Sequence, residues 1–101
     1  MWRHGDVLID AVEKIPKNAR VLDHCVLAEG EVTGHRHEIA ESDSAELLSL
    51  RNQLYLRVVA RQATLIHQEH NPIRIPQGSY RVWQQREYEP KAPRQQRRVV
   101  D

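Results

Sequence analysis

The apolar residues of this chain fall into short runs of strand length, separated by polar and turn-forming residues. Residues 6–12 form the first run, and the segment 14–18, which contains Pro16, interrupts it. Similar runs follow at 21–27, 63–67, 73–75 and 79–88. The segment Pro76-Gln77-Gly78, between the last two runs, is typical of a turn. The pattern predicts several short strands joined by turns.

Two further runs, 45–50 and 53–59, predict a β-hairpin. Only Arg51-Asn52 separates them, which is the length of a tight hairpin turn, and Asn tolerates a positive φ angle. In the second run alternate residues share a face, with 54, 56 and 58 on one side and 55, 57 and 59 on the other. One long helix over 45–61 is the alternative, because several apolar residues there also have helical spacing. The β-branched and aromatic residues of the second half favour the hairpin.

The strand pattern predicts an all-β fold, a small single-domain β-barrel or sandwich spanning residues 1–90. After Pro90 the composition changes, and residues 91–101 contain four basic side chains and one acidic one. This segment lacks the apolar residues that would offset its ordering entropy. We therefore predict a flexible, basic C-terminal tail at 91–101.

Length and charge narrow the classes of protein. With 101 residues, 40% of them hydrophobic, the chain has room for one small core, which excludes an enzyme with separate cofactor and substrate domains. The net charge of +1 provides no overall field toward nucleic acid or a membrane. A domain of this size buries a modest share of its surface, so a bound metal or a subunit interface would supplement its core. A homo-oligomer is therefore expected.

The single cysteine, Cys25, excludes an intramolecular disulfide and a zinc site built from several thiolates. Its place in an apolar run predicts a small buried hydrophobe and not a nucleophile. No stretch of about 18 apolar residues or signal-peptide core is found, so a cytoplasmic protein without membrane contact is expected.

Four of the six histidines form two close pairs, His35 with His37 and His67 with His70. Residues two apart on a strand project from the same face, so His35 and His37 could converge on one ion. Either His67 or His70, at the end of a predicted strand, could supply a third ligand. Imidazole binds Zn, Fe and Ni, and Mn when carboxylates assist. The pattern predicts a site for one divalent metal ion of one of these kinds.

The segment Gly30-(x4)-His35-Arg36-His37-(x3)-Glu41 resembles the first motif of cupins. In that family a glycine precedes a His-x-His pair and a glutamate follows, and these side chains bind metal together with a later histidine inside a jelly-roll β-barrel. The resemblance implies a cupin-like jelly roll in which His35, His37 and Glu41 are ligands. The Pro-x-Gly element departs from the cupin order, because here it follows both downstream histidines.

Phrases along most of the chain also resemble a small bacterial and phage-associated family of uncharacterised proteins. They are Gly5-Asp6-Val7-Leu8-Ile9, Gly30-Glu31-Val32-Thr33-Gly34-His35-Arg36-His37, Glu69-His70-Asn71-Pro72-Ile73, Ile75-Pro76-Gln77-Gly78-Ser79-Tyr80-Arg81-Val82 and Gln85-Arg86-Glu87-Tyr88. This resemblance implies that the phrases belong together, and it implies no substrate.

Other roles for these residues stay open. The four paired histidines could all be structural, solvated on an edge strand or capping a turn. His4 and His24 are expected to have ordinary roles, and glutamates such as Glu41 are more often solvated than ligating. The alternative function is a non-enzymatic, self-associating interaction module. It could contact nucleic acid through the arginines of the tail and the aromatic residues of the last strand, where Tyr80 and Trp83 face opposite sides.

Overall fold

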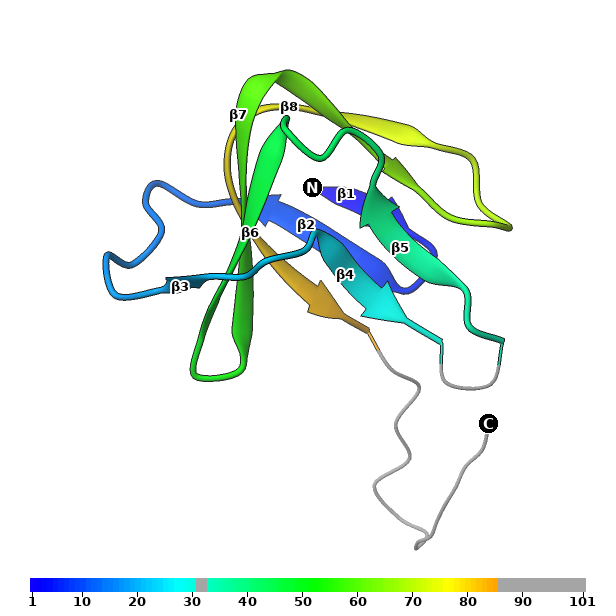
Figure 1. The fold of residues 1–101 in the computed structure, drawn as a ribbon, viewed down its shortest axis with the longest axis horizontal. Helices are drawn as coiled ribbons and strands as arrows, with labels where there is room; N and C mark the ends of the chain where they lie inside the picture. Colours follow the sequence, from blue (N-terminus) through cyan, green and yellow to red (C-terminus); the bar gives the residue numbers. More distant parts are fainter. Residues whose placement is uncertain (31–32, 86–101) are drawn as a thin grey trace, which may run out of the picture.

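Eight antiparallel strands form one rolled sheet in the computed structural model, which describes residues 1–30 and 33–85 (Figure 1). In chain order they are β1 (Trp2–His4), β2 (Val7–Ala11), β3 (Arg20–Val21), β4 (Val26–Glu29), β5 (Arg36–Ile39), β6 (Ala45–Leu50), β7 (Gln53–Ile66) and β8 (Ile73–Gln84). No helix occurs in the described residues, which confirms the all-β prediction.

The two longest strands, β7 and β8, pair along most of their length and bend over the molecule (Figure 1). The first half of β7 pairs with β6 and its end pairs with β5, so the sheet divides around this strand. The strand order is β1-β2-β8-β7-β5-β4, with β3 added to β6. Because β1 and β4 do not pair with each other, the sheet stays open, and the fold is sandwich-like.

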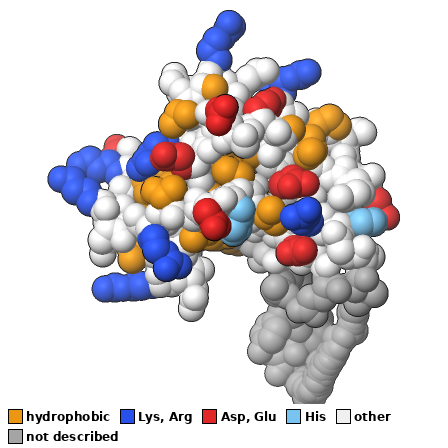
Figure 2. Space-filling model, in the orientation of Figure 1, with side chains coloured by type: hydrophobic (Ala, Val, Ile, Leu, Met, Phe, Trp, Pro, Cys, Tyr) orange, Lys and Arg blue, Asp and Glu red, His pale blue; other side chains and the backbone are white. Residues whose placement is uncertain are grey.

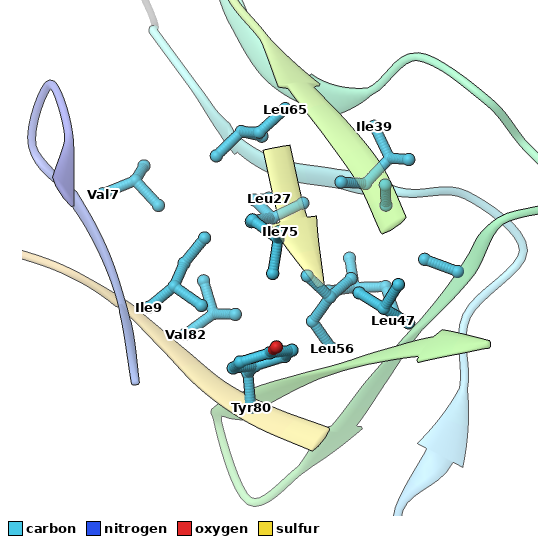
Figure 3. Close-up of a cluster of buried hydrophobic side chains, with 13 residues drawn as sticks. Val7, Ile9, Leu27, Ile39, Leu47, Leu56, Leu65, Ile75, Tyr80 and Val82 are labelled. Carbon is cyan, nitrogen blue, oxygen red and sulfur yellow. The ribbon is translucent and has the colours of Figure 1, made fainter. Parts of the chain in front are cut away.

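The core lies inside this roll. Val7 and Ile9 of β2 belong to the same buried cluster as Leu27 of β4 and Ile39 of β5 (Figure 3). The two ends of the open sheet thus face each other across the core. The largest completely buried side chains are Ile9, Leu47, Leu56, Leu65, Ile75, Val7 and Val58.

The predicted hairpin is confirmed, and the alternative helix over 45–61 is wrong. Leu50 pairs with Gln53, so Arg51 and Asn52 form the turn. Both turn residues have positive φ angles, 51° and 67°, which a two-residue turn needs to match the twist of the strands. Alternate side chains of β7 enter the core as predicted, Leu56 and Val58 among them.

The predicted turn at Pro76-Gln77-Gly78 is wrong, because this segment lies inside β8. Likewise, the run 53–59 and residues 63–66 of the run 63–67 belong to the single strand β7, which ends at Ile66. The register shifts between the pairs Val58↔Gly78 and Gln62↔Pro76. The strands thus continue through the predicted interruptions with an irregularity in their pairing. β2 pairs with β8 only from Tyr80 onward, so the segment around Pro76 has β7 as its one paired strand and tolerates a missing N–H.

The last strand places its aromatic residues as predicted. Tyr80 is buried in the core, whereas Trp83 lies on the other face with the Arg81 guanidinium 4.5 Å from its ring centre. β8 ends at Gln84, before the predicted end at residue 88. Residues 86–88 of that prediction and the whole predicted tail, 91–101, lie outside the described residues.

The described surface mixes charges of both signs. On the face shown in Figure 2, acidic and basic side chains are interspersed with hydrophobic ones. Within the described residues, no helix has the length and apolar character needed to cross a membrane.

Candidate metal centre

Histidines from three separate segments meet at one end of the roll. His4 ends β1, His37 lies on β5, and His67 and His70 belong to the connection between β7 and β8. The ring centre of His37 is 4.3 Å from that of His67 and 5.7 Å from that of His70, and the last two are 4.6 Å apart. The topology therefore brings together residues that are distant along the chain.

Three of these rings can serve as metal ligands. His37, His67 and His70 each offer one nitrogen, and the three nitrogens lie within 4.8 Å of one another. Nitrogens of a tetrahedral site with bonds of about 2.1 Å lie about 3.4 Å apart, so the ligand nitrogens would move together by at most about 1.4 Å on binding an ion. His37 is buried and His70 is exposed, which leaves the outer ring room to rotate.

The ring of His4 lies beside the same group, with its centre 5.0 Å from that of His37 and 5.6 Å from that of His70. Its side chain is buried, its Nδ1 is 3.0 Å from Nδ1 of His37, and its Nε2 donates a hydrogen bond of 2.9 Å to the Asn71 carbonyl. The sequence predicted an ordinary role for His4, which stays a prediction, and it gave no indication of the contact with His37. The spacing of histidines along the chain carries no signal for this contact, because it depends on how β1 and β5, which do not pair, approach each other in the rolled sheet.

A carboxylate faces the buried ring from the β1–β2 turn. Oδ1 of Asp6 lies 3.5 Å from Nε2 of His37, and Oδ2 of Asp6 accepts a hydrogen bond of 2.7 Å from the Gln84 side chain. The Gln84 amide thus holds one oxygen and orients the other toward the histidines.

Burial lowers the pKa values of the inner histidines. The pKa of His37 falls from its ordinary value of 6.5 to about 4, first because of burial and then because His67 and His4 lie close, against an opposing effect of Asp6. Burial also lowers the pKa values of His4 and His67, and the neighbouring His70 adds to both effects. These imidazoles are therefore uncharged at neutral pH, the form in which histidine binds metals.

A glycine allows the rings to pack so closely. Gly5 has a φ angle of +63°, a conformation that glycine adopts without strain. A Cβ at this position would lie 2.6 Å from Nε2 of His70 and 3.1 Å from Cε1 of His37. Any side chain here would therefore push His70 out of its place.

The histidines open onto a cavity of about 390 Å³. Its described lining residues are Gly5, Asp6, Glu29, Gly30, Thr33, His35, His37, His67, Glu69, His70 and Gln84. Three of these are carboxylates, and none is lysine or arginine. Such a lining favours a cation over an anion.

The other two predicted ligands lie outside the group of three. His35 lines the same cavity, where its Nδ1 is 3.6 Å from the Glu69 carboxylate. The Glu41 carboxylate instead accepts hydrogen bonds from the backbone and hydroxyl of Thr64, at 2.8 and 2.7 Å, and these bonds hold its pKa below the ordinary value. Glu41 therefore connects β7 to the segment after β5.

A larger cavity of about 530 Å³ lies away from the histidine group, beside Cys25. The Cys25 thiol donates a hydrogen bond of 3.4 Å to the Ala45 carbonyl and packs against the core. Burial raises the pKa of this thiol, so it stays protonated at neutral pH. Cys25 is partly buried, whereas the sequence predicted a buried residue.

Together, the fold and this centre define a small all-β protein with a histidine-lined, acidic cavity. The chain belongs to the family described as domain of unknown function DUF8820, which it matches over residues 3–85. No curated protein and no solved structure shows a significant match to it. The resemblances to cupins and to a phage-associated family stay predictions.

Proposed function

We propose that this chain is a small metal-binding β domain in which His37, His67 and His70 hold one divalent cation. Three imidazole ligands suit zinc first, and iron or nickel next, whereas manganese prefers more oxygen ligands. The nitrogens lie within 4.8 Å of one another, and three acidic side chains line the adjoining cavity. Both features support a cation.

One observation carries this proposal, the position of the Asp6 carboxylate 3.5 Å from Nε2 of the buried His37. With a pKa of about 4, His37 has no second proton at neutral pH to offer that carboxylate. A metal cation near Nε2 would be attracted by both groups. Asp6 is therefore the fourth ligand that we expect, or the acceptor for a water molecule in that position.

The bound ion would supply Lewis-acid chemistry toward the cavity, because three protein ligands leave room for a further one. The described lining would place no lysine or arginine near the ion. The Gln84 amide would orient the Asp6 carboxylate toward it. The described lining favours a neutral or cationic ligand, since Glu29 and Glu69 disfavour anions.

Metal analysis of protein purified without a histidine tag tests the proposal. We expect about one zinc per chain after zinc loading and dialysis, and a loss of zinc affinity of at least about 100-fold in His37→Ala. His24→Ala is the matched control, because His24 is exposed and outside the cavity. Metal content that is equally low in the wild type and His37→Ala would refute the proposal.

Self-association is the second candidate, and the sheet edges support it. In the described residues β1, β3 and β4 each pair with one strand only. Light scattering across a range of concentrations, with and without a chelator, tests this candidate. A monomer under all these conditions would count against it. Contact with nucleic acid through residues 91–101 stays a prediction, because the tail lies outside the described residues.

A further inference from the structure

His4 and His37 belong to a short chain of hydrogen bonds that ends at the candidate metal centre. The Asn71 carbonyl lies 2.9 Å from Nε2 of His4, and Nδ1 of His4 lies 3.0 Å from Nδ1 of His37. Both imidazoles are buried, with 3% and 5% of the residue exposed. The two contacts constrain each other, because a neutral imidazole has one N–H and one lone pair.

The direction of each bond follows from the carbonyl, which can only accept. His4 must therefore hold its proton on Nε2, which leaves a lone pair on its Nδ1. That lone pair accepts from His37, so the proton of His37 is on Nδ1. The Nε2 atom of His37 is then unprotonated and faces Asp6.

We propose that His4 is a positioning residue, which selects the tautomer of His37 whose Nε2 lone pair faces the metal centre. The inference rests on the proposed function for its effect on metal affinity, and on geometry alone for the tautomer. An outer hydrogen bond of this kind commonly fixes both the ring orientation and the ligand nitrogen of a histidine.

The same bond links two parts of the site. Asn71 follows His70 directly in the β7–β8 connection, and His4 precedes Gly5 and Asp6 in the β1–β2 turn. The bond from His4 to the Asn71 carbonyl therefore holds the segment of one ligand against the turn that presents Asp6. Loss of His4 would have two effects at once. It would free the ring of His37, and it would remove the bond between the two segments.

The tautomers can be read in the metal-free protein. Long-range ¹H–¹⁵N correlation spectra of the ¹⁵N-labelled chain near pH 7.5 distinguish protonated from unprotonated ring nitrogens. We expect His37 to be protonated on Nδ1 and His4 on Nε2. A His37 ring protonated on Nε2 would overturn the inference, whatever the metal affinity.

Two variants of nearly equal shape test the effect on binding. His4→Asn keeps an acceptor near the position of Nδ1, whereas His4→Leu has none. In competition with a zinc chelator, we expect His4→Leu to bind zinc about 10- to 100-fold more weakly than the wild type and His4→Asn to stay within a few-fold of it. Equal affinities of the two variants would overturn the inference.

The outcomes separate the two proposals. If the wild type binds no zinc, the proposed function fails, and the tautomers still decide about His4. If the wild type binds zinc with the reversed tautomers, only the inference about His4 fails. If His4→Leu does not fold, the wild-type spectrum decides.

Discussion

At the residue scale, Gly5 is as important to the candidate centre as the histidines. Its missing side chain leaves the space that the rings of His70 and His37 use. Gly34 offers a matched comparison, because its φ angle of +73° is similar and no atom lies within 4 Å of a Cβ built there. The two glycines therefore separate backbone strain from contact with the site.

We expect Gly5→Ala and Gly34→Ala each to lower the free energy of unfolding by about 1–2 kcal/mol, because alanine is strained at a positive φ. Only Gly5→Ala should also weaken zinc binding, by about tenfold, because its Cβ displaces His70. Urea denaturation and chelator competition on both variants measure the two effects. Equal zinc affinities would mean that the His70 position does not matter for binding.

The lowered pKa of His37 makes the stability of the metal-free protein depend on pH. Its folded pKa of about 4 lies below the ordinary 6.5, so the unfolded chain binds more protons between these values. The stabilisation is complete above about pH 6.5 and is lost as the pH falls toward 4. His4 and His67 shift in the same direction and add to the effect.

From this we expect the metal-free protein to lose about 2 kcal/mol of unfolding free energy through His37 between pH 7 and pH 5. In His37→Asn the loss over the same interval should be smaller by that amount. Urea denaturation at several pH values with a chelator present measures both. Identical pH dependence of the two proteins would show that the ring of His37 is not buried in this way.

At the element scale, the irregular part of β8 is stabilised from within the strand. The Tyr80 hydroxyl donates a hydrogen bond of 2.6 Å to the Pro76 carbonyl. The Tyr80 side chain therefore lies against Gly78. A Cβ on Gly78 would lie 3.2 Å from that hydroxyl, which is tighter than an ordinary contact, so a side chain here would press on the Tyr80 hydroxyl. This bond joins the two parts of β8 on either side of the register shift.

We expect Tyr80→Phe to lower the free energy of unfolding by about 1 kcal/mol, because the Pro76 carbonyl loses its partner. Tyr55→Phe is the control, since within the described residues no hydrogen bond is found for the Tyr55 hydroxyl. Thermal or urea denaturation of the two variants measures the difference. A smaller effect for Tyr80→Phe than for Tyr55→Phe would contradict this role.

At the scale of the whole molecule, the candidate centre lies where β1, at one end of the open sheet, approaches β5 near the other end. β1 is one end of the strand order, and β5 lies next to the other end, β4. The contact between His4 and His37 crosses from one to the other, and His67 and His70 add the β7–β8 connection. An ion bound there would link β5 to the β7–β8 connection and, with Asp6 as a ligand, to the β1–β2 turn as well.

Zinc should therefore stabilise the folded chain. At a free zinc concentration of 100 times Kd, we expect a gain of about 2.7 kcal/mol in unfolding free energy. For a domain of this size the gain corresponds to a rise in Tm of at least about 10 °C. A chelator should reverse the rise, and His37→Ala should show none. An unchanged Tm of the wild type at saturating zinc would contradict the proposal.

Local patterns predicted most of the strands. The alternation in 53–59 and the short Arg51-Asn52 connection depend on neighbouring residues, so the hairpin could be found in the sequence. The continuity of β7 and β8 could not, because a proline and a glycine usually mark a turn. Here the proline and the glycine lie inside β8, opposite the position in β7 where the register shifts. That shift depends on the pairing of the two strands.

For the candidate centre, the sequence indicated which kind of side chain could act as a ligand. Paired histidines in a chain with one cysteine indicated imidazole ligands, and the structure brings His37, His67 and His70 together. The folded chain shows in addition that His4, Gly5 and Asp6 lie beside them and that the Glu41 carboxylate binds Thr64 instead. The two kinds of contact differ in how far apart along the chain their residues lie. Strand patterns arise from contacts between neighbours along the chain, whereas these contacts depend on how the ends of a rolled sheet meet.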